Sequence, residues 1–414
     1  MKAAAVTARP AAEPSRKSAR TTTVTLAVLT QVFHGLTFSG LAVFLPLIRD
    51  DLNLTFAEGG MLAAAMTLTY GLGQIPAGYL SDRFGPKRLV FIGFLVWSAL
   101  SLTLGLIHSF WLAILNQFVA GAFRALMFAP GLSLLASWFP PERRATAMSL
   151  YMVGGFSGTI LVSLGGPLLA MQLGWRYAFI LLAALGIAVA FVFHFHGKDA
   201  PRRGGGAVSI REALHLIRHP ILWVCSAIQF VRFSIVTAFA FWLPSVLVAD
   251  RGFSLEAAGL VAAMSAALTA PSNALGGYVS DRLRNPPLVI GGSLAILAVA
   301  SVLIVVVDST TLLLLVIAVG SIFLQFYFGP LFFVPMEVLG QRTAGTAIGF
   351  NNLFANMGGV LSAYALGVAR DAAGSFVWGF VGIGALCLTG AGLSVVLAKM
   401  RNKALAAQRR AAAS

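Results

Sequence analysis

The chain has 414 residues, of which 58% are hydrophobic and only 10% are charged. A soluble domain carries roughly 25% charged residues, so this composition excludes a soluble globular protein and predicts an integral membrane protein. The net charge of +15 would suit a protein that binds nucleic acid, but the basic residues are spread between apolar runs and form no single patch.

The chain begins with a polar stretch and continues with apolar runs. Residues 1–22 are rich in Ala, Arg, Thr and Pro and lack periodicity, which predicts a disordered tail. Apolar runs of about 20 residues cross a bilayer as helices. The sequence predicts twelve such helices, at 24–48, 57–80, 89–108, 111–138, 146–171, 177–196, 220–248, 256–279, 288–307, 311–335, 345–369 and 376–398. The first run is too long for a cleavable signal peptide.

The distribution of Lys and Arg predicts how these helices are oriented. If both termini lie inside, the inner face collects 23 of the 29 basic residues, and the outer loops hold only Arg49, Arg176, Arg251 and Arg370. Cytoplasmic loops are enriched in basic residues, so we expect both termini in the cytoplasm. Two arginines, Arg124 and Arg232, remain inside spans.

Several polar residues interrupt the spans of the first half. The first span carries Gln31 and His34, three residues apart and therefore on one helix face. Glu58 opens the second span, where a carboxylate complements the positive end of the helix dipole. Further polar groups inside this half are Tyr70, Arg124 near mid-bilayer, and Tyr151.

Residues 197–219 change character and predict a linker. The segment contains Lys198, Arg202, Arg203 and a triple glycine, followed by a short stretch that alternates charged and apolar residues. Beyond it, polar groups recur inside the spans at Gln229, Arg232, Gln325, Asn351 and Asn352.

The second half repeats the first at a nearly constant offset. Gln229 follows Gln31 by 198 residues, and Arg232 follows His34 by the same step. Trp242-Leu243-Pro244 likewise follows Phe44-Leu45-Pro46. Ordered matches of this kind predict two copies of one unit.

A polar segment is also repeated, and it carries a family resemblance. Gly78-Tyr79-Leu80-Ser81-Asp82-Arg83-Phe84-Gly85-Pro86-Lys87-Arg88 lies between the second and third spans, in what we expect to be a loop. Gly277-Tyr278-Val279-Ser280-Asp281-Arg282-Leu283 repeats its first seven positions. With twelve spans in two halves, the chain resembles the major facilitator superfamily. The segments Trp138-Phe139-Pro140-Pro141-Glu142-Arg143 and Gly174-Trp175-Arg176 look like the organic-anion-carrying branch of that superfamily.

The resemblance implies a cavity between the halves and transport by alternating access. It also implies a gating role for the polar segment, carried over to Gly78, Asp82, Arg83, Gly85 and Arg88, and more weakly to Asp281 and Arg282. The second copy lacks the later glycine and basic residues. The efflux-pump signature of the fifth span is incomplete, because Gly166-Pro167 is followed by Leu168-Leu169-Ala170.

The two intramembrane arginines point to the substrate. A charged side chain inside a membrane is costly and usually faces a cavity or a partner, yet all 14 Asp and Glu fall in tails, loops or span ends. Arg124 and Arg232 are therefore available to an anion, which a guanidinium binds in bidentate fashion. The alternative is that each arginine hydrogen-bonds helix carbonyls or amide side chains. His34 is either a neutral hydrogen-bonding group or a protonation switch.

These patterns predict an all-α integral membrane protein with twelve transmembrane helices in two pseudosymmetric six-helix bundles. We expect cytoplasmic tails at 1–22 and 401–414, bundles at 23–197 and 220–400, and a linker at 198–219. The predicted substrate-binding residues are Arg124, Arg232, His34, Gln31, Gln229, Tyr70, Tyr151, Gln325, Asn351 and Asn352.

The expected function is secondary transport of a small carboxylate-type anion across the cytoplasmic membrane, by proton symport or anion exchange. The alternatives are an exporter of amphiphilic compounds by proton antiport, and a membrane sensor or scaffold. No enzyme chemistry, metal or other cofactor is expected, because Cys225 and Cys387 lie in apolar runs and the spans contain no nucleophile triad. The expected partners are an anionic small molecule and the lipid bilayer, without nucleic acid, and we expect a monomer.

Overall fold

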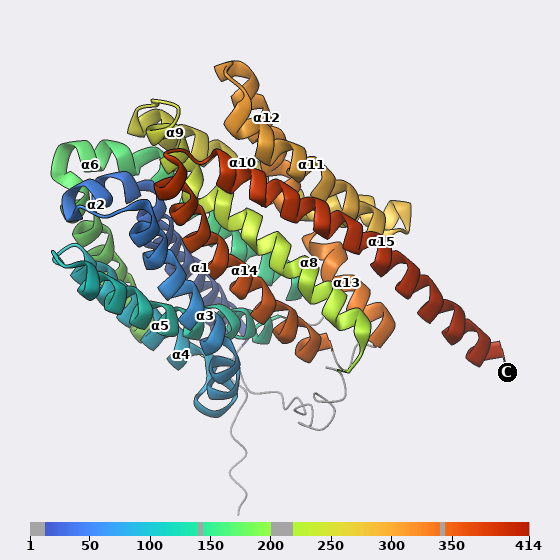
Figure 1. Ribbon diagram of the computed structural model, residues 1–414. Helices are drawn as coiled ribbons and strands as arrows, with labels where there is room; N and C mark the ends of the chain where they lie inside the picture. The colour runs from blue at the N-terminus through green and yellow to red at the C-terminus, as the bar shows by residue number, and fades with distance from the viewer. Residues whose placement is uncertain (1–12, 140–143, 200–217, 340–343, 414) are drawn as a thin grey trace, which may run out of the picture.

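The computed structural model describes residues 13–139, 144–199, 218–339 and 344–413, and all regular elements in these ranges are helices (Figure 1). The N-terminal half contains α1 (Glu13–Val43), α2 (Leu45–Leu52), α3 (Phe56–Phe84), α4 (Pro86–Leu104), α5 (Phe110–Ser137) and α6 (Arg144–His196). The C-terminal half contains α8 (Pro220–Thr237), the π-helix η2 (Ala238–Trp242), α9 (Leu243–Ala249), α10 (Leu255–Leu283), α11 (Pro286–Val306), α12 (Thr310–Phe326), α13 (Phe328–Leu339), α14 (Ala344–Ala373) and α15 (Val377–Ala413).

The helices have the length and composition of membrane spans. Among the described residues, nine helices are long and apolar enough to cross a membrane. One of them, α6, is long enough for two crossings and is broken at Gly174, whose φ of 79° lies outside the helical region. The chain is therefore an integral membrane protein whose described elements are all helices.

The two halves repeat the same packing. Helix α1 packs on α6, α3 on α5 and α4 on α6 in the N-terminal half. In the C-terminal half α8 packs on α14, α10 on α12 and α11 on α15. The repeated Leu-Pro pair also has the same local effect in both halves, since helices are interrupted at Phe44 and at η2, just before Pro46 and Pro244. Proline lacks the N–H that would continue the helix.

The polar segment at 78–88 is helical for most of its length, so the expectation of a loop is wrong. Helix α3 continues to Phe84, Gly85 takes a φ of 90°, and α4 begins at Pro86. A glycine tolerates positive φ and a proline suits the first turn of a helix, so one residue makes the reversal. In the second copy α10 continues to Leu283, and Arg284 has a φ of 50°.

The expected disordered tail is also partly helical. Helix α1 begins at Glu13, which corrects the expectation for residues 13–22. Extending an existing helix is far easier than starting one, so the membrane span propagates into the polar sequence before it. Residues 1–12 and 200–217 lie outside the described residues, and with them most of the predicted linker.

The halves pack closely at one end of the bundle. At this end α2 ends at Leu52, α3 begins at Phe56 and α10 begins at Leu255, and we call it the Gly174 end. We call the opposite end the Gly85 end. Helices α3 and α14 pack together across the halves, as do α6 and α10. A Cβ on Gly60 would clash with the carbonyl oxygen of Ala363. Gly259 and Gly367 approach the other half equally closely, since a Cβ on either would clash with the carbonyl oxygen of Ser163 or Phe56.

A capping contact also joins the halves at the Gly174 end. Asp371 of α14 accepts hydrogen bonds from the backbone N–H groups of Phe56 (2.9 Å) and Ala57 (2.6 Å) in the first turn of α3. Thr55 and Glu58 form a capping box at the same helix start. The guanidinium of Arg49 lies 3.3 Å from the centroid of the Phe56 ring.

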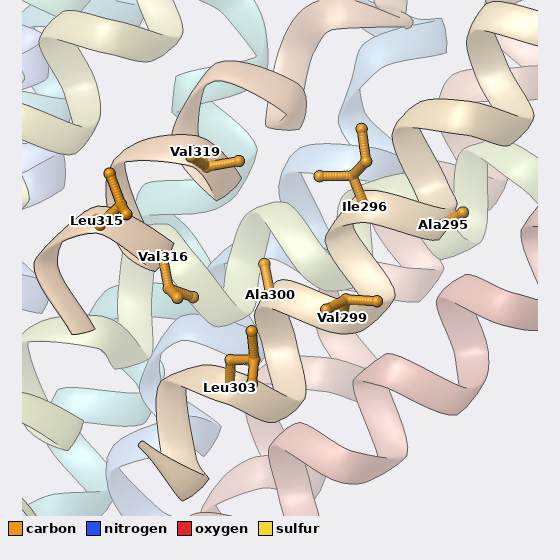
Figure 2. A pocket seen from close by; sticks show the side chains of 8 residues that line it. All are labelled: Ala295, Ile296, Val299, Ala300, Leu303, Leu315, Val316 and Val319. Atoms are coloured by element: carbon orange, nitrogen blue, oxygen red, sulfur yellow. The ribbon is translucent and has the colours of Figure 1, made fainter. Parts of the chain in front are cut away.

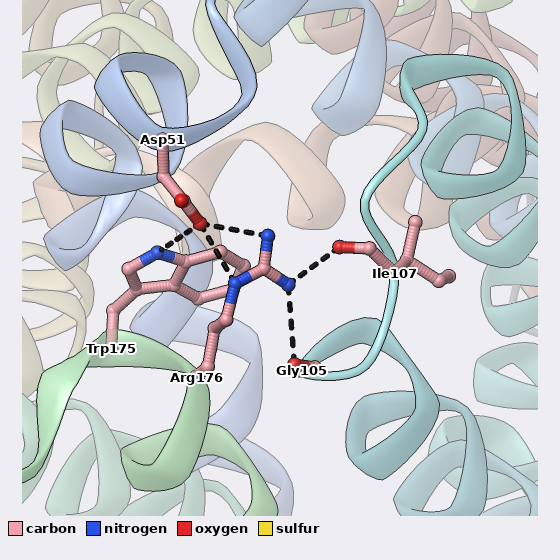
Figure 3. Close-up of polar contacts among 5 residues, drawn as sticks. All are labelled: Asp51, Gly105, Ile107, Trp175 and Arg176. Carbon is pink, nitrogen blue, oxygen red and sulfur yellow. Dashed lines mark hydrogen bonds and ion pairs between the residues drawn. The ribbon is translucent and has the colours of Figure 1, made fainter.

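Gly174-Trp175-Arg176 has a clear structural role (Figure 3). The Asp51 carboxylate accepts hydrogen bonds from the Trp175 indole (3.1 Å) and from Nε of Arg176 (2.8 Å). Nη1 of Arg176 also donates to the carbonyl oxygens of Gly105 (3.2 Å) and Ile107 (2.5 Å). These contacts tie the start of the second part of α6 to α2 and to the turn between α4 and α5.

We expect Asp51→Ala to lower the free energy of unfolding by about 1 kcal/mol, because it leaves two donors without their acceptor and the site is partly exposed. The measurement is the thermal unfolding midpoint of the purified protein in detergent. Asp50→Ala is the control, since the neighbouring Asp50 is exposed and its carboxylate accepts no hydrogen bond from the described residues. Equal midpoints for the two variants would contradict the assigned role.

Candidate substrate-binding site

Each half places one arginine inside a membrane helix. Arg124 lies at the middle of α5, and Arg232 lies in α8 two turns before η2. The ion pairs found among the described residues join Arg176 to Asp51, Arg370 to Asp250 and Arg401 to Glu337. No described carboxylate lies within ion-pair distance of Arg124 or Arg232.

Arg124 is held by α1 and α3. Its Nε donates a hydrogen bond to Nε2 of His34 over 3.2 Å. Its guanidinium carbon lies 4.1 Å from the ring centroid of Phe38 and 4.0 Å from that of Tyr70. Aromatic faces attract cations and replace part of the lost hydration, which explains how the charge is accommodated without a carboxylate.

The hydrogen bond fixes the protonation state of His34. A guanidinium only donates, so Nε2 of His34 must present a lone pair, and the neutral ring carries its proton on Nδ1. The ring stacks on Phe38, with centroids 5.7 Å apart, and lies 5.0 Å from Trp97. The Trp97 indole donates to Thr37, one turn from His34. The imidazole is therefore oriented by contacts with α1 and α4.

Arg232 is held by amide side chains. Its Nε donates to Oε1 of Gln229 (2.6 Å) and its Nη1 to Oε1 of Gln325 (3.1 Å). The guanidinium carbon lies 4.8 Å from the ring centroid of Phe328. Only 4% of Arg232 is exposed, whereas Arg124 is partly exposed. In this conformation Arg124 is thus the more accessible of the two cations.

The two hydrogen bonds occupy matching places in the two halves. His34 and Arg124 join the first and fourth predicted spans. Arg232 and Gln325 join the seventh and tenth, at offsets of 198 and 201 residues from His34 and Arg124. In the N-terminal half the arginine, Arg124, is therefore on the fourth span. In the C-terminal half the arginine, Arg232, is on the seventh span, which corresponds to the first.

Unpartnered polar atoms lie around Arg232. Nε2 of Gln229 and the hydroxyl of Tyr327 are buried and make no hydrogen bond with the described residues. Asn351 accepts a hydrogen bond from Ser226 (2.7 Å), but its Nδ2 is likewise unpaired. A buried donor without an acceptor is costly, so such groups are candidates for contact with a ligand.

Other predicted binding residues make contacts within the protein. The hydroxyl of Tyr151 donates to the carbonyl oxygen of Met127 (3.0 Å) and is also hydrogen-bonded to Gln31. Both side chains are buried between α1, α5 and α6. The carbonyl oxygen of Asn352 accepts from Asn356 (2.7 Å), and the Asn352 side chain is partly exposed. Their role in binding stays a prediction.

The predicted gating residues lie at the Gly85 end. Arg83 and Arg88 are exposed, with guanidinium carbons 5.4 Å and 5.9 Å from the Phe84 ring centroid. Gly78 lies within α3, and Gly85 makes the turn. In the second copy, Arg282 contacts the Tyr278 hydroxyl and Asp281 is exposed. The side chain of Asp82 lies outside the described part, so its predicted latch role stays a prediction.

The sequence did not predict the aromatic residues at these sites, namely Phe38 beside Arg124, Trp97 beside His34, and Phe233 and Phe328 beside Arg232. Phe38 follows His34 by four residues and therefore lies on the same helix face, a spacing that could have identified it. Trp97 comes from α4, and nothing in its local sequence marks it.

An apolar groove on the second half lies apart from these polar clusters (Figure 2). It is formed by α11 and α12 and is lined by Ala295, Ile296, Val299, Ala300, Leu303, Leu315, Val316 and Val319. None of these side chains can hydrogen-bond an anion, so this groove is not a candidate substrate site.

Comparison with known proteins identifies a family and several transporters to which this chain is similar. The family model of the Major Facilitator Superfamily matches residues 27–363. A probable sulfoacetate transporter of Cupriavidus necator is 26% identical over 85% of this chain and 87% of its own length. The hexuronate transporter of Bacillus subtilis is 25% identical, with coverages of 87% and 90%. A probable galactarate/D-glucarate transporter of Escherichia coli is 24% identical, with coverages of 81% and 84%.

The solved structures agree on the fold. A bacterial homolog of the human lysosomal transporter Spinster, in an inward-facing and occupied conformation, superposes with a TM-score of 0.75 at 20% identity and covers 95% of this chain and 97% of its own. The all-helical fold, the repeated packing of its halves and the match of one family model over most of the sequence show that this chain belongs to the major facilitator superfamily.

Proposed function

We propose that the protein is a secondary transporter that moves a small organic anion across the cytoplasmic membrane by alternating access. The observation that carries the proposal is the pair Arg124 and Arg232, one in each half, for which no described carboxylate serves as counter-ion. The named relatives support it, because the transporters of sulfoacetate, hexuronate and galactarate all act on organic acids.

The proposed topology has twelve spans in two six-helix bundles. The nine membrane-length helices, together with α3, α14 and a second crossing by α6 after Gly174, make up this number. The bundles comprise residues 23–197 and 220–400, with the linker 198–219 and both tails in the cytoplasm. The excess of Lys and Arg at the Gly85 end supports placing that end inside.

The packing of the halves supports an inward-facing state. At the Gly174 end α3 and α14 are in backbone contact and Asp371 caps α3 across the halves. Gly259 likewise lies against the backbone of Ser163, across the halves, at the Gly174 end. Transport would then require the contacts at the Gly174 end to break while the Gly85 end closes.

In this proposal an anion is held between Arg124 and Arg232 as the halves rock. Arg124 would meet a carboxylate or sulfonate entering from the Gly85 end, since it is the more exposed arginine. The rest of the anion would be oriented by the amide side chains of Gln229, Gln325 and Asn351. Coupling would occur by proton symport or by anion exchange. An exporter of amphiphilic compounds receives no support from the named relatives, which carry organic acids.

We expect Arg124→Ala and Arg232→Ala each to weaken binding of organic acids by about 10- to 100-fold, because each removes charge-assisted hydrogen bonds worth about 1.5–3 kcal/mol. The measurement is the thermal shift of the purified carrier against a panel of sulfoacetate, D-glucuronate and galactarate, followed by counterflow of the acids that bind. Ligands that bind the folded state raise its apparent stability.

Arg124→Lys tests the geometry, because it keeps the charge but not the planar fork, and an intermediate loss is expected. Arg410→Ala removes a basic residue from the exposed end of α15 and controls for net charge. Wild-type affinity and exchange in both alanine variants would refute the anion clamp.

We expect Asp371→Ala to shift the carrier away from the state closed at the Gly174 end by roughly fivefold, since losing a helix cap costs about 1 kcal/mol. Spin labels at Leu106→Cys and Asp308→Cys, both exposed at that end on opposite halves, report the opening as a longer distance. Cys225 and Cys387 are buried and remain unlabelled.

Asp50→Ala, which alters a carboxylate at the same end without such a contact, should leave the label distances unchanged. A distance distribution for Asp371→Ala identical to that of the labelled parent would show that the cap does not hold the halves together.

A further inference from the structure

The contact between His34 and Arg124 joins a titratable ring to a permanent cation inside the membrane. Nε of Arg124 donates to Nε2 of His34 over 3.2 Å. The same guanidinium lies against Phe38 and Tyr70, and the imidazole lies against Phe38 and Trp97. The lone pair on Nε2 is therefore held toward the arginine by the packing of α1, α3, α4 and α5.

A proton arriving at Nε2 would break this contact. The imidazolium would have only donors, and so does the guanidinium, so no hydrogen bond between them could remain. Two adjacent cations in a low-dielectric site also repel each other strongly. As long as this contact is kept, Arg124 thus holds His34 neutral.

The other groups around His34 do not offset a second positive charge. Tyr70 from α3 faces Arg124 with its ring, Trp97 from α4 is not titratable, and Phe38 and Thr37 from α1 are neutral. The part of α6 that packs against α1 near Gly35 presents Gly155 and Gly158. Among the described residues, Arg124 is the charged group in contact with His34.

An anion would reverse this balance. A carboxylate or sulfonate on Arg124 supplies the missing negative charge and an acceptor for a protonated Nε2. The guanidinium, released from His34, could then bind the anion with two parallel hydrogen bonds. Binding of the anion and protonation of His34 therefore favour each other, and this thermodynamic coupling is reciprocal.

We propose that His34 is the proton-coupling residue of the carrier. In the empty carrier it is a neutral acceptor for Arg124. With the anion bound it takes one proton from water at Nε2, donates a hydrogen bond to the anion, and returns that proton to water on the other side when the anion leaves. Transport is then symport of one proton with each anion. This inference rests on the proposed binding of an anion at Arg124, and it selects symport over exchange.

The test compares wild type with His34→Gln in proteoliposomes, using D-glucuronate and sulfoacetate as substrates. Glutamine keeps an acceptor for Arg124 and a donor for the anion but does not titrate. Counterflow without a pH gradient measures binding and exchange of the substrate. A pH dye inside the proteoliposomes, used with an imposed pH gradient, measures whether protons move with the substrate. For the monoanion D-glucuronate, wild type should accumulate about tenfold for a gradient of one pH unit and should acidify the lumen.

His34→Gln should lose both accumulation and acidification, and the counterflow and D-glucuronate thermal shift that it retains should no longer vary with pH. Proton-driven accumulation that survives in His34→Gln would overturn the inference, as would wild-type counterflow without any proton movement. Wild type that exchanges neither acid, with an unchanged thermal shift in Arg124→Ala, would instead refute the proposed function and this inference with it.

A second measurement needs no variant and is independent of how His34→Gln folds. Calorimetric titration of wild type with D-glucuronate in buffers of different ionisation enthalpy reports the protons taken up with each anion. We expect uptake that is greatest, and approaches one proton per anion, at pH values above the range in which free His34 titrates and below the range in which anion-bound His34 titrates. Zero uptake across pH 6 to 8, the range around the usual titration of histidine, would overturn the inference.

Discussion

The constraint on which this structure depends is the cost of a guanidinium inside a membrane. Neither Arg124 nor Arg232 has a carboxylate partner among the described residues, and each is instead held by neutral acceptors and aromatic faces. Neutral partners hold the cation in place without cancelling its charge. A site of this kind retains a net attraction for an anion, which an internal ion pair would have consumed.

The two repeated halves place different chemical groups at equivalent positions. In each half a hydrogen bond joins equivalent helices at equivalent depth, through His34 and Arg124 in one and Arg232 and Gln325 in the other. The N-terminal pair contains a group that titrates, whereas the C-terminal pair does not. If the proposed function holds, the C-terminal half supplies a fixed anion anchor and the N-terminal half a proton-sensitive one.

Small residues determine how the two halves meet. Helices α3 and α14 approach so closely at the Gly174 end that a side chain at Gly60 or Gly367 would strike the opposite backbone. The surface there is held by backbone contact and by the Asp371 cap, which are many weak interactions rather than one strong ion pair. Such an interface suits a carrier, because it can separate and reform during each cycle.

The sequence by itself determined the membrane class, the positions of the helices, the internal repeat and the two arginines without counter-ions. These follow from local hydropathy and from residue spacing, which do not require knowledge of the packing. Only the tertiary structure decided that Arg124 meets His34, 90 residues away, and that Trp175 and Arg176 tie α6 to Asp51. It also decided that helix continues through Asp82 to Phe84. Contacts of this kind depend on which faces of separate helices come together, and that is set by the packing of the whole bundle rather than by any one segment.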